Sequence, residues 1–558
     1  MNFLKQTKLW FILIIIYPWL YIFQGFDVTD SGFSLSLYSS AFIDGISHDY
    51  PRYFTTLIGG LWHKYFGFIG YIGFKIIYIF LLYMIMFMVW HLTKKFDKKN
   101  ILPFAIFLTL IFITKSGGNW INYNILSSLF YIYIIYFLYT GIIYSNSIFI
   151  LISGFIAGIN IFIRLPNILD ILFGLIFVYT YYLYKKNFYK EFFYFIGGYS
   201  LGIVFGLFIL INLGVYEQYI DSIVNLFAVF MNNTTSNYSH TSLLQLLIKD
   251  YTYIVLTTLF IFISITILKN FKSLFTDKKI VYLLSLLIAI TSLNFLNIIC
   301  IWKYIYLGLF YSGILIILIE SKDIKLKILS VLSLMFVGLI PLGSDNGVYN
   351  SIYGMWLIMP IVILYFANQK YLQVKRYTII NENLFNFLKT TFILSTLLFS
   401  LHLKFHSTYR DSNNRLSLCY GIDNNKLSYT YTTKNRAKVV NEFIDKLKKY
   451  THNRELFLYD KIAIFYYILN KPVPLSHPWA VNKLQNDEFQ KEFLKYAIKN
   501  LPIIANPKYS VSNTVWPQVK EPLPHMYYKN RDTIKNFMTK FNYHKVWEND
   551  FFEIWDNQ

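Results

Sequence analysis

Long uninterrupted apolar runs constrain this chain more than any other feature. Ile, Leu, Phe and Tyr are nearly continuous over residues 68–92, 125–144, 192–213, 280–300 and 328–342. About twenty such residues match the ~30 Å hydrocarbon thickness of a bilayer. Because a bilayer core offers no water to backbone N–H and C=O groups, these runs must be helices. Composition agrees, since 15% of the 558 residues are charged, against about 25% in a soluble chain.

The apolar runs predict a polytopic α-helical membrane protein of about 11–13 transmembrane helices. A short run can belong to a tilted or broken helix, which is why the count is a range. The N-terminal run lacks a small-residue cleavage site and is interpreted as an uncleaved first span. The predicted spans are residues 8–25, 68–92, 101–114, 125–144, 147–164, 168–184, 192–213, 251–268, 280–300, 303–319, 328–342, 352–368 and 390–405.

Basic side chains between the predicted spans indicate the orientation of the chain. They gather in alternate loops, which the positive-inside rule places in the cytoplasm. The N-terminus is then cytoplasmic, and the less basic loops 26–67, 115–123, 214–250 and 343–351 lie outside, as do the residues after 406. The net charge of +21 is explained by contact with anionic lipid, so nucleic acid is not an expected partner. The cytoplasmic basic residues are Lys94, Lys95, Lys98, Lys99, Lys185, Lys186, Lys190, Lys269, Lys272, Lys278, Lys279, Lys322, Lys325, Lys327, Lys370, Lys375 and Arg376.

The chain changes character after its last apolar run. Asn, Lys and Asp become frequent, and long apolar runs stop. We therefore expect a transmembrane domain over residues 1–405 and a small extracytoplasmic α/β domain over residues 406–558. In the second domain the apolar spacing predicts a helix and several short strands. The helix is residues 437–450, and the strand segments are residues 455–460, 501–507 and 544–556.

The first outer loop, residues 26–67, is the segment best suited to chemistry. Asp27 and Asp30 follow the first span directly and are expected at the outer membrane surface. Residues 33–46 and 53–66 have the apolar spacing of helices that lie in a membrane interface. A carboxylate pair covered by such helices can meet a lipid headgroup on one side and a soluble substrate on the other. The alternative is that both aspartates only cap the start of a helix.

The segment DVTDSGF (27–33) resembles the acidic motif of GT-C membrane glycosyltransferases, which stands in the first outer loop. The nearest branch comprises the bacterial protein-mannosyltransferase-like and aminoarabinose-transferase-like enzymes. The segments NYNILS (122–127) and GFIAGINIFIRLPN (154–167), and the layout of many spans before an outer soluble domain, are also similar. Ser31 stands where many relatives carry a second acid, which leaves open whether Asp27 or Asp30 is catalytic.

The resemblance implies transfer of a hexosyl or pentosyl group, with inversion, from a polyprenyl-phosphate donor. The acceptor is a glycan, a lipid or a protein at the outer face of a bacterial cytoplasmic membrane. On physical grounds, a hydroxyl acceptor needs a general base, for which Asp27 or Asp30 is suited. The leaving lipid phosphate gains negative charge and needs cations or hydrogen-bond donors.

Cations on the predicted outer side are candidates for the donor phosphate. Arg164 ends the fifth span before Pro166, where it either binds phosphate or anchors the helix by reaching the headgroups. Lys115 lies in a glycine-containing outer loop, and Arg52 and Lys303 are further candidates. The candidates for substrate binding are His48, Asp49, Asn122, Asn124, Asp345 and Asn346. For the GSDNG segment, residues 343–347, a plain turn is the alternative.

Metal dependence is left open by the sequence. Asp27 and Asp30 can together hold a divalent cation with waters, because carboxylate oxygens suit hard cations. Asp44, His48 and Asp49 are interpreted as a polar turn, since their spacing does not indicate a metal site. The two cysteines, Cys300 and Cys419, stand too far apart in the sequence to indicate a disulfide framework or a metal cluster.

Two other functions are alternatives. A surface-polysaccharide polymerase or ligase also handles lipid-linked sugars, but it should carry arginines in its middle outer loop, and residues 214–250 contain none. A non-enzymatic transporter or flippase of lipid-linked sugars should show an internal repeat and charged or broken helices at the bilayer midplane. The sequence shows neither clearly.

Overall fold

The computed structural model of the chain divides into two compact units. The first unit comprises Met1–Tyr17, Phe80–Lys115 and Tyr123–His402, and the second comprises Pro18–Ile79, Ser116–Asn122 and Leu403–Gln558. The predicted division after residue 405 assigned the first outer loop to the transmembrane domain, whereas the second unit groups this loop with the C-terminal part. The structure describes residues 6–43, 50–115, 118–185, 188–231, 240–268, 270, 277–298, 301–374, 377–484, 486–524 and 528–558.

Apolar helices dominate the chain up to residue 406. Within the described ranges, eight are long and apolar enough to cross a membrane, and four shorter apolar helices accompany them. The eight are Tyr71–Phe96, Tyr123–Tyr144, Leu165–Tyr184, Tyr189–Asn212, Thr241–Leu268, Trp302–Glu320, Gly347–Asn368 and Glu382–His406. The four are Thr7–Trp19, Leu102–Ile113, Ser147–Ile163 and Lys279–Leu293.

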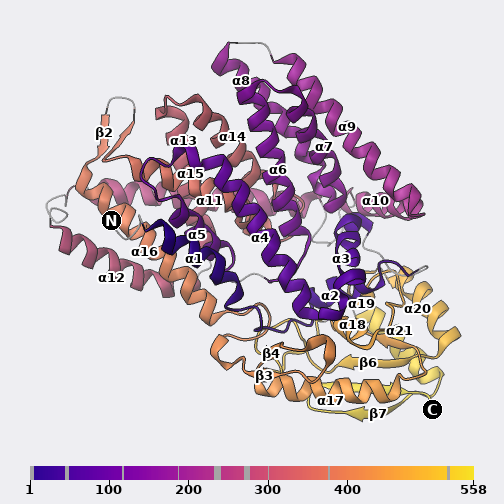
Figure 1. Ribbon diagram of the computed structural model, residues 1–558. Helices are drawn as coiled ribbons and strands as arrows, with labels where there is room; N and C mark the ends of the chain where they lie inside the picture. The colour runs from indigo at the N-terminus through magenta and orange to yellow at the C-terminus, as the bar shows by residue number, and fades with distance from the viewer. Residues whose placement is uncertain are drawn as a thin grey trace. The chain divides into compact units, whose positions relative to one another are not determined.

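Figure 1 labels the elements in chain order. The elements that build the first unit, or that run into it from the second, are α1 (Thr7–Ile16), α4 (Tyr71–Thr93), α5 (Leu102–Ile113), α6 (Tyr123–Tyr144), α7 (Ser147–Ile163), η6 (Leu165–Leu175), α8 (Ile176–Tyr184), α9 (Tyr189–Asn212), α10 (Tyr216–Met231), α11 (His240–Leu268), α12 (Lys278–Ile298), α13 (Trp302–Glu320), α14 (Ile324–Leu339), η8 (Gly347–Gly354), α15 (Met355–Asn368), β1 (Leu372–Val374), β2 (Tyr377–Ile380) and α16 (Glu382–His406). Every residue of α5 is buried, so this helix lies at the centre of the unit.

Two predicted boundaries are wrong, each for a local reason. α1 ends at Ile16 rather than near residue 25, because Pro18 lacks the N–H that a helix interior needs. The predicted outer loop 214–250 is largely helical, since α10 lies within it and α11 begins at His240. The polar residues of these two segments stand within helices, whereas the prediction took them to mark a loop.

Close packing of α7 against α9 depends on glycine. A Cβ added at Gly158 would lie 2.2 Å from the carbonyl oxygen of Tyr199, and one at Gly198 would lie 2.1 Å from that of Leu151. Gly202 faces Gly158 closely enough that an added Cβ would lie 3.0 Å from its partner's Cα. Glycines four residues apart lie on one helix face, and this stripe lets two backbones touch, as in pairs of membrane helices.

A four-stranded sheet forms the centre of the C-terminal part of the second unit (Figure 1). Its strand order is β5-β6-β8-β7, with β5 and β6 parallel and the other neighbours antiparallel. Phe457 pairs with Ile504, which in turn pairs with Trp555. The strands are β5 (Leu456–Leu458), β6 (Ile503–Pro507), β7 (His544–Glu548) and β8 (Phe552–Asp556), all within the predicted strand segments.

Helices cover both faces of this sheet. Side chains alternate between the two faces of a strand. On one face Phe552 stacks on Phe443, with ring centroids 4.2 Å apart. On the other face Phe457 packs in one apolar cluster with Phe493 and Phe537. The covering helices are α17 (Lys434–Tyr450) on the first face, and α20 (Asn486–Asn500) and α21 (Tyr528–Lys540) on the second.

The two helices predicted in the first outer loop are present in the second unit. They are α2 (Asp30–Ser40) and α3 (Tyr53–Phe66). α2 is buried along most of its length, so it does not have the free face expected of an interfacial helix. A Cβ at Gly32 would lie 2.7 Å from the Cβ of Ile464 in α18 (Ile464–Leu469), so glycine permits this close approach. The start of α2 is thereby fixed against the C-terminal part of the chain.

Substitution of neighbouring glycines in α9 tests the packing of α7 on α9. Gly198→Ala places a methyl group against a backbone carbonyl, so we expect it to destabilise the fold by about 1–3 kcal/mol. Gly197→Ala is the matched control, because an added Cβ at Gly197 meets nothing within 4 Å. Thermal unfolding of the purified protein should show a lower midpoint for Gly198→Ala alone. Equal midpoints for the two variants would contradict the described packing.

Candidate functional site

Asp27 is a buried carboxylate that organises the start of α2. Its side chain is 3% exposed. One carboxylate oxygen accepts hydrogen bonds from the Thr29 backbone N–H at 2.9 Å and from the Thr29 hydroxyl at 2.7 Å. The other accepts from the Ser31 N–H at 2.7 Å. These donors are among the N–H groups that the first turn of a helix leaves unpaired, so the capping role considered for Asp27 is observed.

Asp30 stands in a different environment one turn further on. It is the first residue of α2, and its side chain is 28% exposed. The guanidinium of Arg410 lies 3.1 Å from its Oδ2, and the Tyr409 hydroxyl donates a hydrogen bond to the same atom. Of the two predicted aspartates, Asp30 is the one that solvent can reach.

Arg410 joins the two parts of the chain that carry the site. Its guanidinium donates to the Thr29 hydroxyl at 2.5 Å as well as pairing with Asp30. Its backbone adopts a positive φ of 49°, which few residues other than glycine adopt. Tyr409 packs against Trp120, with ring centroids 5.5 Å apart, and the Trp120 indole donates to the Ser34 hydroxyl at 3.2 Å.

A buried ion pair holds the segments that carry Asp30 and Arg410 together. Asp411 and Arg436 lie 2.6 Å apart with fully buried side chains. The second oxygen of Asp411 accepts from the Phe26 N–H at 2.7 Å. Arg436 also donates to the Arg410 carbonyl at 2.9 Å and to the Trp516 carbonyl at 2.7 Å. The pair therefore fixes residues on both sides of the site.

Burial and neighbouring charges shift the pKa of three side chains at the site, those of Asp27, Arg410 and Tyr409. Burial, together with the charge of Asp30, raises the pKa of Asp27, and Arg410 and the hydrogen bonds from Ser31 and Thr29 offset only part of the rise. Burial opposes the charge of Arg410, but Tyr409 and the two aspartates outweigh it, so the pKa of Arg410 is raised. Burial and the charge of Asp30 hold the pKa of Tyr409 well above its ordinary value. The Tyr409 phenol therefore stays protonated and donates to Asp30.

Two further predicted residues lie in this unit, and two lie outside the described residues. Arg52 precedes α3, and its guanidinium lies 5.4 Å from the ring centroid of Phe33. The Asn122 amide donates to the carbonyl of Trp120 at 3.0 Å, and the ring of Trp120 packs against Tyr409. His48 and Asp49 lie outside the described residues.

The remaining predicted residues belong to the first unit. Lys115 is fully buried and donates to the Phe112 carbonyl at 2.9 Å, with the Trp302 ring 3.9 Å away. Asn124 lies in the first turn of α6, where its carbonyl accepts from the Ser128 hydroxyl at 2.9 Å.

Arg164 is also in the first unit, where it closes a helix end. It is 5% exposed and donates to the Ile340 carbonyl at 2.9 Å and to the Leu342 carbonyl. These carbonyls follow the last turn of α14, where a cation complements the helix dipole. Arg164 is thus buried against protein, not extended toward the surface as an anchor would be.

Asp345 and Asn346 are exposed in a turn, as the alternative interpretation expected. The Asn346 N–H bonds to the Ser344 hydroxyl at 3.2 Å. An aspartate that the sequence did not indicate holds this turn: Asp250 accepts from the Val348 N–H at 2.9 Å. Lys303, a predicted cation candidate, lies 3.8 Å from the same carboxylate.

A metal ion does not fit Asp27 as it stands. Its Oδ1 accepts two hydrogen bonds and its Oδ2 one, and the side chain is 3% exposed, so a hydrated divalent cation has little access to it. Among the residues that the structure describes, no three His, Cys, Asp or Glu side chains are grouped to hold a metal.

The residues that sequence reasoning missed are Tyr409, Arg410, Asp411 and Arg436. A signal was present, because TYRD (408–411) follows the last predicted span as directly as Asp27 follows the first.

Comparison of the chain with models of protein families, with curated proteins and with solved structures gives no match.

Removing one charge of the buried pair tests its structural role. Asp411→Asn leaves the guanidinium of Arg436 uncompensated, which should destabilise the fold by about 3–5 kcal/mol. Glu548→Gln is the control, because Glu548 pairs with Lys508 on the exposed surface of the same unit and such pairs contribute little. Thermal unfolding should shift strongly for the first variant and hardly for the second. A wild-type midpoint for Asp411→Asn would show that the pair does not support the site.

Proposed function

We propose that this chain is a GT-C-type membrane glycosyltransferase that takes a sugar from a polyprenyl-phosphate donor. The acceptor reacts at the outer face of a bacterial cytoplasmic membrane, in a polytopic protein of about 11–13 transmembrane helices. The observation that carries the proposal is the contact between the partly exposed carboxylate of Asp30 and the cation of Arg410. A base for the acceptor and a cation for the leaving phosphate then stand side by side.

Asp30 is the base in this proposal, and Asp27 is a positioning residue. A general base must come within hydrogen-bond distance of the hydroxyl that it deprotonates. Asp27 is buried, and donors of its own segment already occupy both of its oxygens. Asp30 is partly exposed, and its two partners bind the same oxygen, Oδ2. Its Oδ1 is the atom that we assign to the acceptor proton.

Arg410 is the cation that we assign to the donor phosphate. A planar guanidinium binds phosphate oxygens through two parallel hydrogen bonds, and the Arg410 side chain is 28% exposed. When phosphate occupies these donors, the Asp30 carboxylate is released from Arg410 and can turn to the acceptor hydroxyl. Arg410 replaces Arg164 as our first choice, because the Arg164 guanidinium donates to the carbonyls of two residues that follow α14. Binding of the donor phosphate by Lys115 and Arg52 stays a prediction.

The proposed reaction is a single displacement. The acceptor oxygen attacks the anomeric carbon while its proton passes to the Asp30 carboxylate. The bond between that carbon and the phosphate oxygen breaks, and the lipid phosphate leaves with the electron pair. Arg410 stabilises the charge that develops on this leaving group. Attack opposite the leaving group inverts the anomeric centre.

Contacts between distant segments support an outer location for the C-terminal part. The Tyr431 N–H donates to the Phe23 carbonyl at 2.8 Å, and Asp411 accepts from Phe26. Residues 23–30 and 408–436 must therefore lie on the same side of any membrane. If α1 crosses from the cytoplasm, both segments are outside, which agrees with the lysine distribution.

Donor consumption by aspartate variants tests the proposal. Purified full-length protein in lipid nanodiscs is incubated with polyprenyl-phosphate-linked sugars and candidate acceptors. Asp30→Asn should lower turnover about 100-fold or more, because the base is lost, with an unchanged melting temperature. Asp27→Asn should lower turnover and melting temperature together, since its amide NH₂ would face an N–H donor. Asp445→Asn is the control, because Asp445 is exposed on α17 in the same unit as Asp30, and it should match the wild type.

Two outcomes would count against the proposal. Wild-type turnover by Asp30→Asn would remove the base assignment. Failure of the wild-type protein to consume any polyprenyl-phosphate sugar, with acceptors present, would favour the transporter alternative.

A further inference from the structure

The carboxyl end of β5 carries a polar cluster that the proposed reaction does not use. β5 runs parallel to β6, and ligands of such sheets bind beyond the carboxyl ends of the strands. Asp460, two residues after β5, is 5% exposed and has a φ of 69°. Residues other than glycine held in this conformation concentrate at functional sites.

Side chains from two other elements converge on Asp460. Arg531, in α21, lies 2.6 Å from its Oδ2. Asn482, in α19 (Ala480–Lys483), donates to its Oδ1 at 3.5 Å. The Trp479 carbonyl accepts from the Asn482 N–H at 2.9 Å, and the Lys461 ammonium lies 5.3 Å from the Trp479 ring. All five residues belong to the second unit.

Three polar atoms of this cluster are buried without a hydrogen-bond partner. They are the Nε1 of Trp479, the Oδ1 of Asn482 and the Nε of Arg531. Asn482 is 2% exposed, so ordinary solvent does not satisfy its carbonyl. Since nearly all buried polar atoms in proteins are paired, two donors and one acceptor left unpaired around one carboxylate indicate a place that a ligand completes.

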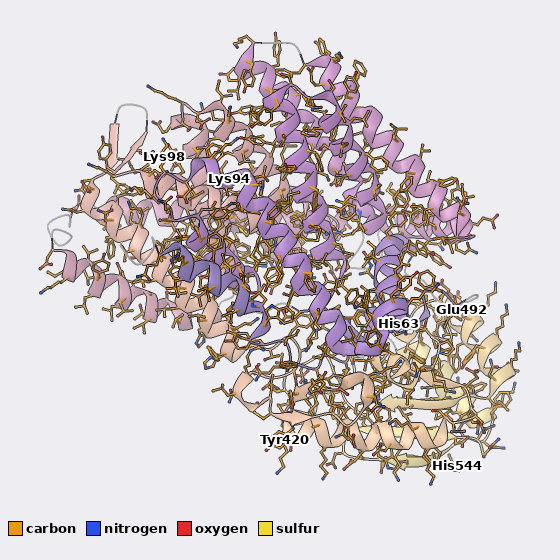
Figure 2. The ribbon with its side chains drawn as sticks, in the orientation of Figure 1. His63, Lys94, Lys98, Tyr420, Glu492 and His544 are labelled. Atoms are coloured by element: carbon orange, nitrogen blue, oxygen red, sulfur yellow. The ribbon has the colours of Figure 1, made fainter. Side chains whose placement is uncertain are left out.

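The cluster is held next to α2. The Trp479 ring lies 4.9 Å from that of Phe33, three residues after Asp30 and so about one helical turn away. The loop before Trp479 is anchored by Glu492 of α20, labelled in Figure 2, which accepts from the Ser476 N–H at 3.0 Å. The Nδ1 of the His477 ring accepts from the backbone N–H of Trp479 at 2.9 Å. The indole is therefore fixed close to the proposed base.

We propose that Trp479, Asn482, Asp460 and Arg531 form an acceptor subsite for a neutral saccharide. The role of the bound saccharide as acceptor rests on the proposed function, but the saccharide site itself does not. A sugar hydroxyl both donates and accepts, which matches the unpaired N–H groups, the unpaired carbonyl and the carboxylate. The Trp479 ring offers an apolar face for the sugar ring. Asp460 disfavours an anionic ligand, whereas Arg531 and Lys461 disfavour a cationic one.

Direct binding measurements test the subsite without donor or turnover. Fluorescein-labelled tetrasaccharides of glucose, mannose, galactose and N-acetylglucosamine are titrated with full-length protein in nanodiscs and followed by fluorescence polarisation. At least one should bind, and Trp479→Phe, which keeps an aromatic ring but loses the N–H, should bind it about threefold to tenfold more weakly. Asn482→Ala should weaken the same tetrasaccharide similarly.

The control variant is Trp547→Phe, because Trp547 is also partly buried but stacks on Phe443 at the other face of the sheet. It should bind as the wild type does, and all variants should share the wild-type melting temperature. Absence of binding by all four tetrasaccharides, or equal binding by Trp479→Phe and Trp547→Phe, would overturn the subsite. Tighter binding of labelled tetragalacturonate would overturn the neutral ligand class.

Failure of the subsite and failure of the proposed function give different results. Binding that depends on Trp479 in a protein that consumes no donor would leave a saccharide site and remove the transferase. Donor consumption that depends on Asp30, without saccharide binding that depends on Trp479, would leave the transferase and remove the subsite.

Discussion

The buried pair of Asp411 and Arg436 is the constraint on which the candidate site depends. Two charges taken out of water need full pairing, because a buried charge without a partner is strongly destabilising. Here the two side chains pair with each other and also bond to the Phe26 N–H and the Arg410 carbonyl. Any structure that keeps the pair buried therefore keeps residues 26–30 next to residues 409–411. Asp30 and Arg410 meet as a consequence.

Local hydrogen bonding gives Asp27 and Asp30 different partners and different exposure. Asp27 accepts bonds from within its own turn and so fixes the start of α2. Asp30, three residues later, contacts Tyr409 and Arg410 and remains partly exposed. The same residue type thus serves structure at one position and is available for chemistry at the other. The proposed saccharide subsite adds a place for the acceptor one turn along α2, beside Phe33.

The sequence predicted the elements of the fold well, because they depend on local periodicity. The apolar runs became helices, YFTTLIGGLWHKYF became α3, and the strands after residue 450 lie where their patterns indicated. The acidic segment 27–30, chosen from the sequence as a candidate site, stays a prediction. What the sequence could not predict is which aspartate is exposed. That depends on Tyr409, whose hydroxyl meets Asp30 across 379 residues of chain. The carbonyl partners of Arg164 could not be predicted for a similar reason, since they lie 176 or more residues away in the chain.

The central claim is that the unit containing Asp30 faces the non-cytosolic side, where a lipid-linked sugar can reach it. Cys419 is exposed and belongs to the same compact unit as Asp30. In a Cys300→Ser background it is the single thiol of the chain. Treatment of intact cells with a membrane-impermeant maleimide should therefore label the protein at Cys419. Labelling that requires permeabilised cells would place this unit in the cytosol and contradict the account.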